Sequence, residues 1–182
     1  MIASGYMAKR IGRPSGWNGP SHVLDIYSVS GHVSDDFADY ISFWKHNGYW
    51  LFDSPELIRA VAAESKADLK ETQLFYYEVY EYEFDGEQWK MFAPETSFKT
   101  EVEVPSQKKL EGFDVVTFSC HAAPECSPLS CNTLAKEIRT NSHCLVESFD
   151  EAKRHLESGV FNDSEPGPYR IFAVYSVGWE EV

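Results

Sequence analysis

The sequence predicts a single α+β domain spanning residues 1–182, in which a mainly antiparallel sheet of about five or six strands carries about four helices. Its 182 residues are enough for one sizeable core and few for two. Apolar residues make up 43% of the chain and aromatic residues 15%, which is typical of a folded protein. Segments with strand-like alternation are interspersed with segments of helical spacing. No internal repeat is apparent, which argues against a solenoid.

The first third of the chain is expected to contain two strands, an exposed loop and two helices. Strands are expected at 7–11 and 23–29, separated by the Gly- and Pro-rich loop 12–20, which cannot hold regular structure. A helix is expected from Ser34, because apolar residues follow it at helical spacing. Another helix is expected from Ser54, a capping residue that precedes a proline at the first helical position.

The rest of the chain contains more strand and turn signals. Aromatic and β-branched residues at 73–84, followed by Asp85-Gly86, predict a strand and a hairpin turn into a second strand at 89–92. Glu78 lies among tyrosines in this strand, so we expect a buried carboxylate bonded to phenol hydroxyls. Further strands are expected at 98–104, 113–118 and 169–177, and further helices from Ser127 and from Ser148.

The chain is strongly acidic, with a net charge of −13. This charge disfavours direct binding to nucleic acid or to anionic lipid. Between residues 71 and 103 there are nine acidic residues against two basic ones. No apolar run is long enough to span a bilayer, and the start of the chain lacks an apolar signal core, so a cytoplasmic location is expected.

All four cysteines lie in one segment together with two histidines. The six residues are Cys120, His121, Cys126, Cys131, His143 and Cys144. One interpretation is a zinc site with the four cysteines as ligands, although their spacing does not form the two tight pairs of structural zinc sites. No other cofactor is indicated.

A second interpretation makes Cys126 a nucleophile. A helix start follows it, which would favour the thiolate, and His121 or His143 would act as the base. A third is a set of buried thiols, since free cysteine is among the most buried residue types and Cys131 lies on the apolar face of the helix expected from Ser127.

The leading hypothesis is a binding or inhibitor protein that presents carboxylates and tyrosines to a basic protein partner, as immunity proteins and nucleic-acid mimics do. Trp17 is expected to be exposed in its loop and available to a partner. The residues expected at the interface are Glu81, Tyr82, Glu83, Glu87 and Trp17. The alternative is a small enzyme that uses the segment from Cys120 to Cys144, with a zinc ion or with Cys126 as nucleophile. The partner, the substrate and the oligomeric state stay open.

Overall fold

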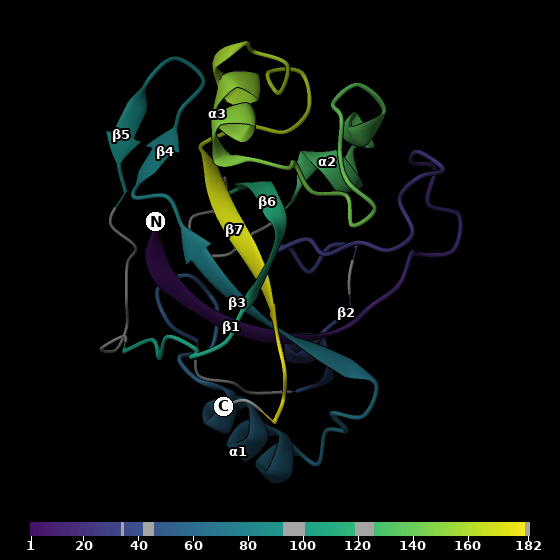
Figure 1. The fold of residues 1–182 in the computed structure, drawn as a ribbon, viewed down its shortest axis with the longest axis vertical. Coiled ribbons are helices and arrows are strands. Elements are labelled where there is room, and N and C mark those ends of the chain that lie inside the picture. Colours follow the sequence, from purple (N-terminus) through teal and green to yellow (C-terminus); the bar gives the residue numbers. More distant parts are fainter. Residues whose placement is uncertain (34, 42–45, 93–100, 119–125, 181–182) are drawn as a thin grey trace.

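The computed structural model of the protein describes residues 1–33, 35–41, 46–92, 101–118 and 126–180. Within these residues, seven strands form one antiparallel sheet that curves into a half-barrel (Figure 1). The strands are β1 (Ile2–Arg10), β2 (Asp35–Asp36), β3 (Thr72–Val79), β4 (Tyr82–Phe84), β5 (Trp89–Met91), β6 (Lys109–Thr117) and β7 (Tyr169–Val177). The helices are α1 (Pro55–Ser65), α2 (Pro128–Cys131) and α3 (Phe149–Glu157), with 3₁₀ turns at Phe37–Tyr40 and Leu134–Lys136.

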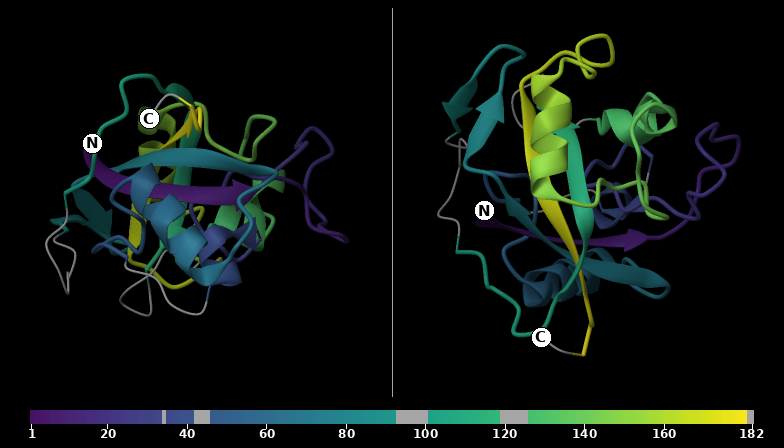
Figure 2. Two further views of the ribbon diagram at one scale, coloured as in Figure 1. Left: turned by 90° about the horizontal axis from the view of Figure 1, so that it is seen from below. Right: turned by 45° about the horizontal axis from the view of Figure 1, so that its top comes forward.

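Four long strands form the body of the sheet, in the order β1, β3, β7, β6. The short β2 pairs with β1 at one edge. β4 continues the β3 side of the sheet and pairs with β7 at a single position, and β5 pairs with β4 to make a hairpin. The helices α1 and α3 lie at opposite ends of the sheet (Figures 1 and 2). The α+β class and the antiparallel sheet are therefore as expected, whereas the numbers of strands and helices differ.

Several boundaries are confirmed. β7 has the predicted limits, and α1 follows Ser54, whose side chain accepts a hydrogen bond from the backbone N–H of Leu57 at 3.2 Å. Ser148 caps α3 in the same way, through the N–H of Glu151 at 3.2 Å. The loop 12–20 has no helix or strand.

The helix expected from Ser34 is wrong. Ser34 itself lies outside the described residues, but the next residues form β2 and a 3₁₀ turn, and Ile41 is already extended. The cause is long-range. Asp36 pairs with the fully buried Lys9 of β1 across 2.6 Å, so the segment is held as an edge strand where local spacing favoured a helix.

The strand expected at 23–29 is also wrong, although Val23, Ile26 and Val29 are buried. Its backbone bonds to distant parts of the chain without forming a ladder: Leu24 N donates to Ser142 O at 2.8 Å, and Tyr27 N donates to His143 O at 3.1 Å. Elsewhere, the described part of the strand expected at 98–104 is irregular. The helix expected from Ser127 is interrupted by a left-handed residue, Thr133.

Two buried charged residues, Lys9 and Asp114, hold the end of the segment in which a strand was expected at 23–29. The Lys9 ammonium donates to the carbonyl oxygens of Ser28, Val29 and Ser30 at 2.6, 3.3 and 3.2 Å. Asp114, on β6, accepts from Ser28 Oγ at 3.0 Å and from Val29 N at 2.8 Å. Burial nevertheless raises the pKa of the Asp114 carboxyl. The segment is thereby fixed to both outer long strands of the half-barrel.

The fold contains an internal repeat that the sequence analysis missed. Each half consists of a long strand with a bulge, a loop that begins with asparagine, a helix and a second long strand. The first half is β1, the loop 47–53, α1 and β3, and the second is β6, the loop 141–147, α3 and β7. The strands β3 and β7 pair so that Tyr77 opposes Val174, and each of these two residues also opposes the bulge glycine of its own half. The two halves are therefore related by an approximate twofold rotation about this pair.

The asparagine loops are the most similar parts of the repeat. Asn47 Nδ2 donates to Ser4 O at 2.8 Å, and its Oδ1 accepts from the backbone N–H groups of Tyr49 and Leu51 at 2.9 and 3.2 Å. In the second half, Asn141 Nδ2 donates to Glu111 O at 2.7 Å, and its Oδ1 accepts from the N–H groups of His143 and Leu145 at 2.9 and 3.1 Å. Each asparagine thus closes its own loop and binds that loop to the bulge of the adjacent long strand.

A glycine in each bulge permits this approach. Gly5 and Gly112 have φ angles of +136° and +148°, which favour glycine. A Cβ atom would lie 2.7 Å from Leu51 Cβ at Gly5, and 2.8 Å from Leu145 Cβ at Gly112. The sheet therefore requires glycine here for both the dihedral angle and the space.

Replacing either glycine with alanine should destabilise the protein by at least about 3 kcal/mol, because backbone strain and overpacking add. Gly86→Ala is the matched control: φ there is +103°, but open space surrounds the added methyl group. We expect that variant to lose only about 1–2 kcal/mol. Urea unfolding of the three variants measures the difference. Equal losses in all three would show that the loops do not press against the bulges.

Candidate functional site

The β4–β5 hairpin carries the residues expected at a partner interface. Asp85 closes the turn by accepting from the N–H groups of Glu87 and Gln88 at 3.0 and 2.8 Å, and it also pairs with Lys90 across 2.5 Å. The pKa of its carboxyl is lowered by these contacts, with Lys90 as the main cause. Glu81 and Glu87 are exposed. The hairpin therefore presents two acidic side chains to solvent at well-defined positions.

Glu83 has a different environment from its neighbours. It accepts from Arg170 Nη2 at 2.6 Å, and the Arg170 guanidinium is stacked between Phe92 and Phe118, 3.4 and 3.9 Å from the ring centroids. Arg170 is only 4% exposed, and burial lowers the pKa of its guanidinium to about 10. Glu83 balances this buried charge, so its first role is to anchor the hairpin to β7.

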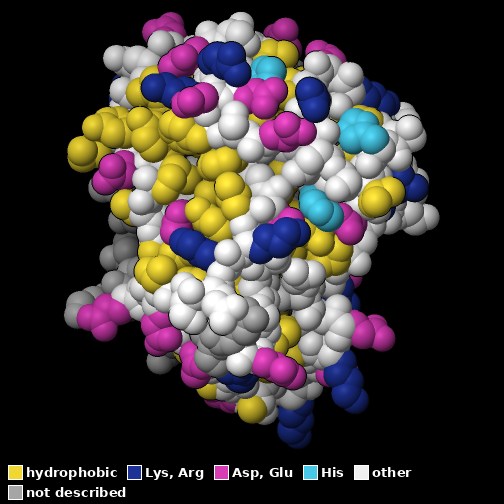
Figure 3. All heavy atoms as spheres, viewed as in Figure 1, with side chains coloured by type: hydrophobic (Ala, Val, Ile, Leu, Met, Phe, Trp, Pro, Cys, Tyr) yellow, Lys and Arg dark blue, Asp and Glu magenta, His cyan; other side chains and the backbone are white. Residues whose placement is uncertain are grey.

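Aromatic side chains form a continuous cluster beside the exposed acids. The Tyr80 ring centroid lies 5.3 Å from Tyr82, 5.5 Å from Trp89 and 4.8 Å from Phe149 of α3. Met91, at the end of the hairpin, is 72% exposed. Figure 3 shows hydrophobic side chains gathered at the upper left, where Figure 1 places this hairpin, with acidic side chains next to them. These aromatic residues and Met91, with Glu81 and Glu87, are called the hairpin surface below.

Trp17 is less available than expected. Its indole N–H donates to Ser130 O at 2.9 Å, and the ring packs against the apolar cluster beneath α2 and α3. The ring also lies so close to Gly19 that a Cβ atom there would overlap it. Trp17 therefore anchors the loop 12–20 to the body of the protein and leaves only part of its ring for a partner.

The acids of the segment 71–103 that the structure describes do not form one surface. Glu71 precedes β3, and Glu78 lies in the middle of the sheet. Glu101 and Glu103 contact Asp53 through their backbone N–H groups, close to the start of α1. The charge that appears contiguous in the sequence is thus divided between the hairpin and other parts of the fold.

Glu78 accepts hydrogen bonds from two tyrosines, as expected. Tyr175 donates to it at 3.0 Å and Tyr76 at 3.3 Å, while Lys108 forms an ion pair with it and lies 4.3 Å from the Tyr175 ring. Burial alone would raise the pKa of this carboxyl, but the contacts from Lys108 and Tyr175 outweigh it, and the pKa is lowered.

Cys126, Cys131 and Cys144 are free thiols, whereas Cys120 and His121 lie outside the described residues. The sequence suggested that a helix start would favour a thiolate at Cys126. The structure contradicts this: α2 has four residues, and the hydrogen bond to Cys131 together with burial raises the pKa of the Cys126 thiol. Burial also raises the pKa of Cys144. Among the described residues, no three metal-binding side chains converge.

His143 contacts acidic and aromatic residues. Its Nδ1 lies 2.5 Å from Asp25 Oδ1, and its ring is stacked on Tyr27 at 4.0 Å. Its Nε2 lies 4.0 Å from Glu111 Oε2, and Glu111 Oε1 accepts from Ser176 at 2.5 Å. The ring therefore connects the loop that contains Asp25 and Tyr27 to β6.

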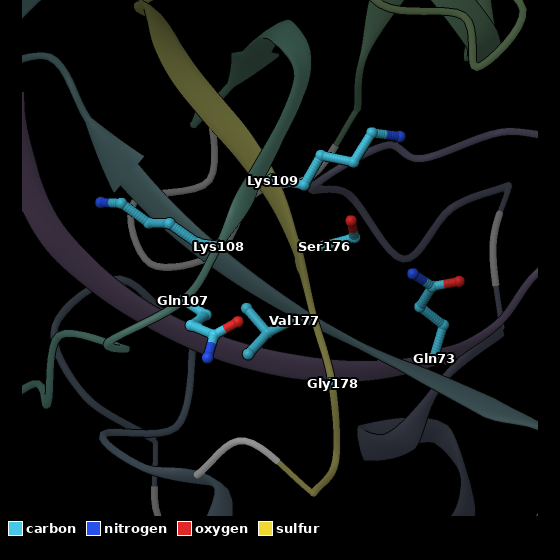
Figure 4. A pocket seen from close by; sticks show the side chains of 7 residues that line it. All are labelled: Gln73, Gln107, Lys108, Lys109, Ser176, Val177 and Gly178. Atoms are coloured by element: carbon cyan, nitrogen blue, oxygen red, sulfur yellow. The ribbon is translucent and has the colours of Figure 1, made fainter.

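An open pocket of about 450 Å³ lies next to Ser176. It is lined by Gln73, Gln107, Lys108, Lys109, Ser176, Val177 and Gly178 (Figure 4). Lys108 and Lys109 extend in opposite directions, and each is paired with a carboxylate, Glu78 or Glu111. The lining is polar with its charges compensated. No local pattern in the sequence indicates this pocket, because its residues come from three regions far apart in the chain.

Comparisons with protein-family models, with curated proteins and with solved structures found no match. In the part of the chain that the structure describes, no helix is long and apolar enough to cross a membrane.

Glu78→Gln should make stability less dependent on pH. Because the folded-state pKa of Glu78 is lowered, its stabilising contribution is present above the unfolded-state pKa, about 4.3, and is lost as the pH falls through the folded-state value. We expect the variant to lose about 1 kcal/mol at pH 7. The loss should become much smaller at pH 3.

Urea unfolding at the two pH values measures this loss, with the exposed Glu64→Gln as the matched control. An unchanged loss at pH 3 would show that the ionised carboxylate is not what stabilises the fold.

Proposed function

We propose that this protein binds a basic protein partner through the hairpin surface. The observation that carries the proposal is the combination, on one hairpin, of exposed carboxylates at Glu81 and Glu87 with a partly exposed aromatic cluster and the 72% exposed Met91. Aromatic side chains and methionine are enriched in interfaces, and carboxylates steer the approach of a basic surface.

The rigidity of the hairpin supports the proposal. Its turn is closed by Asp85, its base is held by the pair of Glu83 with Arg170, and the indole N–H of Trp89 donates to Glu157 of α3 at 2.9 Å. A surface that is ordered before binding loses less conformational entropy on association. The hairpin therefore suits recognition without rearrangement.

The net charge of −13 supports a basic partner. Charges of one sign over the whole molecule raise the rate at which an oppositely charged protein arrives, and salt reduces this effect. The hairpin surface then supplies the local contacts that would make the encounter specific.

Charge reversal on the hairpin tests the proposal. The protein, with Glu81→Lys and Glu87→Lys combined, is used as bait in an extract of the source cells, beside the unchanged protein. The matched control combines Glu64→Lys and Glu71→Lys, two exposed acids away from the hairpin, so both variants carry the same net charge. We expect a basic protein to be retained by the unchanged chain and by the control, and to bind the hairpin variant at least about tenfold more weakly.

Titration of the purified partner at increasing salt completes the test. Affinity for the unchanged chain should fall as salt screens the attraction. Equal capture by both variants, no basic protein captured by the unchanged chain, or an affinity that does not respond to salt would each contradict the proposal.

A further inference from the structure

Cys126 and Cys131 occupy two positions that meet at the start of a helix. Ser127 is the cap residue of α2, so Cys126 immediately precedes the cap and Cys131 is the fourth helical residue. Side chains at these two positions commonly pack against each other. Here the two thiols are in hydrogen-bond contact. The local fold thus places both sulfur atoms side by side.

The surroundings of the two thiols differ. Cys131 is partly exposed, whereas Cys126 is buried, with Asn132 Oδ1 as an acceptor 3.4 Å from its Sγ atom. The amide nitrogen of Asn132 in turn donates to Glu165 at 3.0 Å, so the acceptor is held in place. Cys144, at 2% exposure, is closed to solvent. Cys131 is thus the more exposed residue of the pair, and Cys126 lies next to it.

We propose that Cys126 and Cys131 form a reversible disulfide when a hydroperoxide oxidises them. The Cys131 thiolate attacks the O–O bond, which breaks to leave a sulfenic acid on Cys131 and to release water after protonation. The Cys126 sulfur then attacks the Cys131 sulfur, the S–O bond breaks, and a second water leaves with the Cys126 proton. Overall, two thiols are oxidised to one disulfide while one hydrogen peroxide is reduced to two water molecules.

The greater exposure of Cys131 and its hydrogen bond with Cys126 both favour these roles. By stabilising the anion, the contact from Cys126 lowers the pKa of the Cys131 thiol and raises that of Cys126. The thiolate is the reactive form, so the partly exposed member of the pair is also the better nucleophile. The disulfide would join the residue that precedes the cap of α2 to the last residue of this helix.

Oxidation of the folded protein followed by peptide mapping tests the proposal. The reduced protein is treated with hydrogen peroxide, its remaining thiols are alkylated in denaturant, and the chain is cut after glutamate. Cuts after Glu111, Glu125, Glu137 and Glu147 place Cys120, the pair and Cys144 in three separate peptides. We expect the peptide 126–137 to carry an internal disulfide and the Cys144 peptide to be fully alkylated.

Two single variants separate the roles. Cys126→Ser should leave a sulfenic acid on Cys131 that dimedone traps, because no resolving thiol remains. Cys131→Ser should reduce oxidation of the peptide 126–137 at least about tenfold, because Cys126 is buried and burial by itself raises the pKa of its thiol. Circular dichroism checks that both variants fold.

Several results would overturn the proposal. A disulfide that joins Cys131 to Cys120, to Cys144 or to a second copy of the chain would assign another partner. The same peroxide concentration is applied to the folded protein and to the protein unfolded in urea. If Cys126 and Cys131 are oxidised only in urea, the folded site does not react. Faster oxidation of Cys126 than of Cys131 would reverse the roles.

Discussion

The close approach of an asparagine loop to a strand bulge, made once in each half, is the constraint on which this fold depends. Asn47 and Asn141 satisfy backbone groups of their own loops and of the neighbouring strand, and Gly5 and Gly112 leave room for them. Each loop leads directly into a capped helix. The contact therefore sets where α1 and α3 begin and fixes each helix to its own long strand. Since β3 and β7 pair at the centre, two such units complete the half-barrel.

A comparison of the two halves also shows which side chains the fold requires and which it does not. Around the pocket, four positions of the second half carry a more polar or charged side chain than the equivalent positions of the first half. The equivalent pairs are Ile2 and Lys109, Ser4 and Glu111, Tyr49 and His143, and Val79 and Ser176. The first half makes the same bulge, loop and strand pairing without these polar groups. Their presence beside the pocket and the loop with Asp25 is thus a property of the second half alone, and it links that loop to β6.

Local signals in the sequence predicted the elements that local interactions determine. Caps at Ser54 and Ser148, and the turn at Asp85, depend on neighbouring residues, and they were found. The segment after Ser34 and the strand expected at 23–29 were mispredicted, because the buried Lys9 and Asp114 hold those segments from distant strands. The repeat was missed for another reason. The halves share only short similarities: a glycine followed by an aromatic residue in the strand, and an asparagine, a leucine and a serine at equal spacing in the loop. The loops that separate these features differ in length.

The acids of the segment 71–103 likewise divide into those that hold the fold together and those that are exposed. A count of acids along the segment 71–103 treats them alike, yet Glu83 compensates Arg170, Asp85 closes the turn, and Glu78 pairs with Lys108. A carboxylate that balances a buried cation, as Glu83 does for Arg170, is held beside it, because leaving that cation uncompensated is costly at low dielectric. The exposed Glu81 and Glu87 have no such obligation to a buried cation. Recognition of a basic surface would therefore depend on Glu81, Glu87 and the aromatic cluster. Glu83 and Asp85 hold the hairpin in the shape that presents these residues.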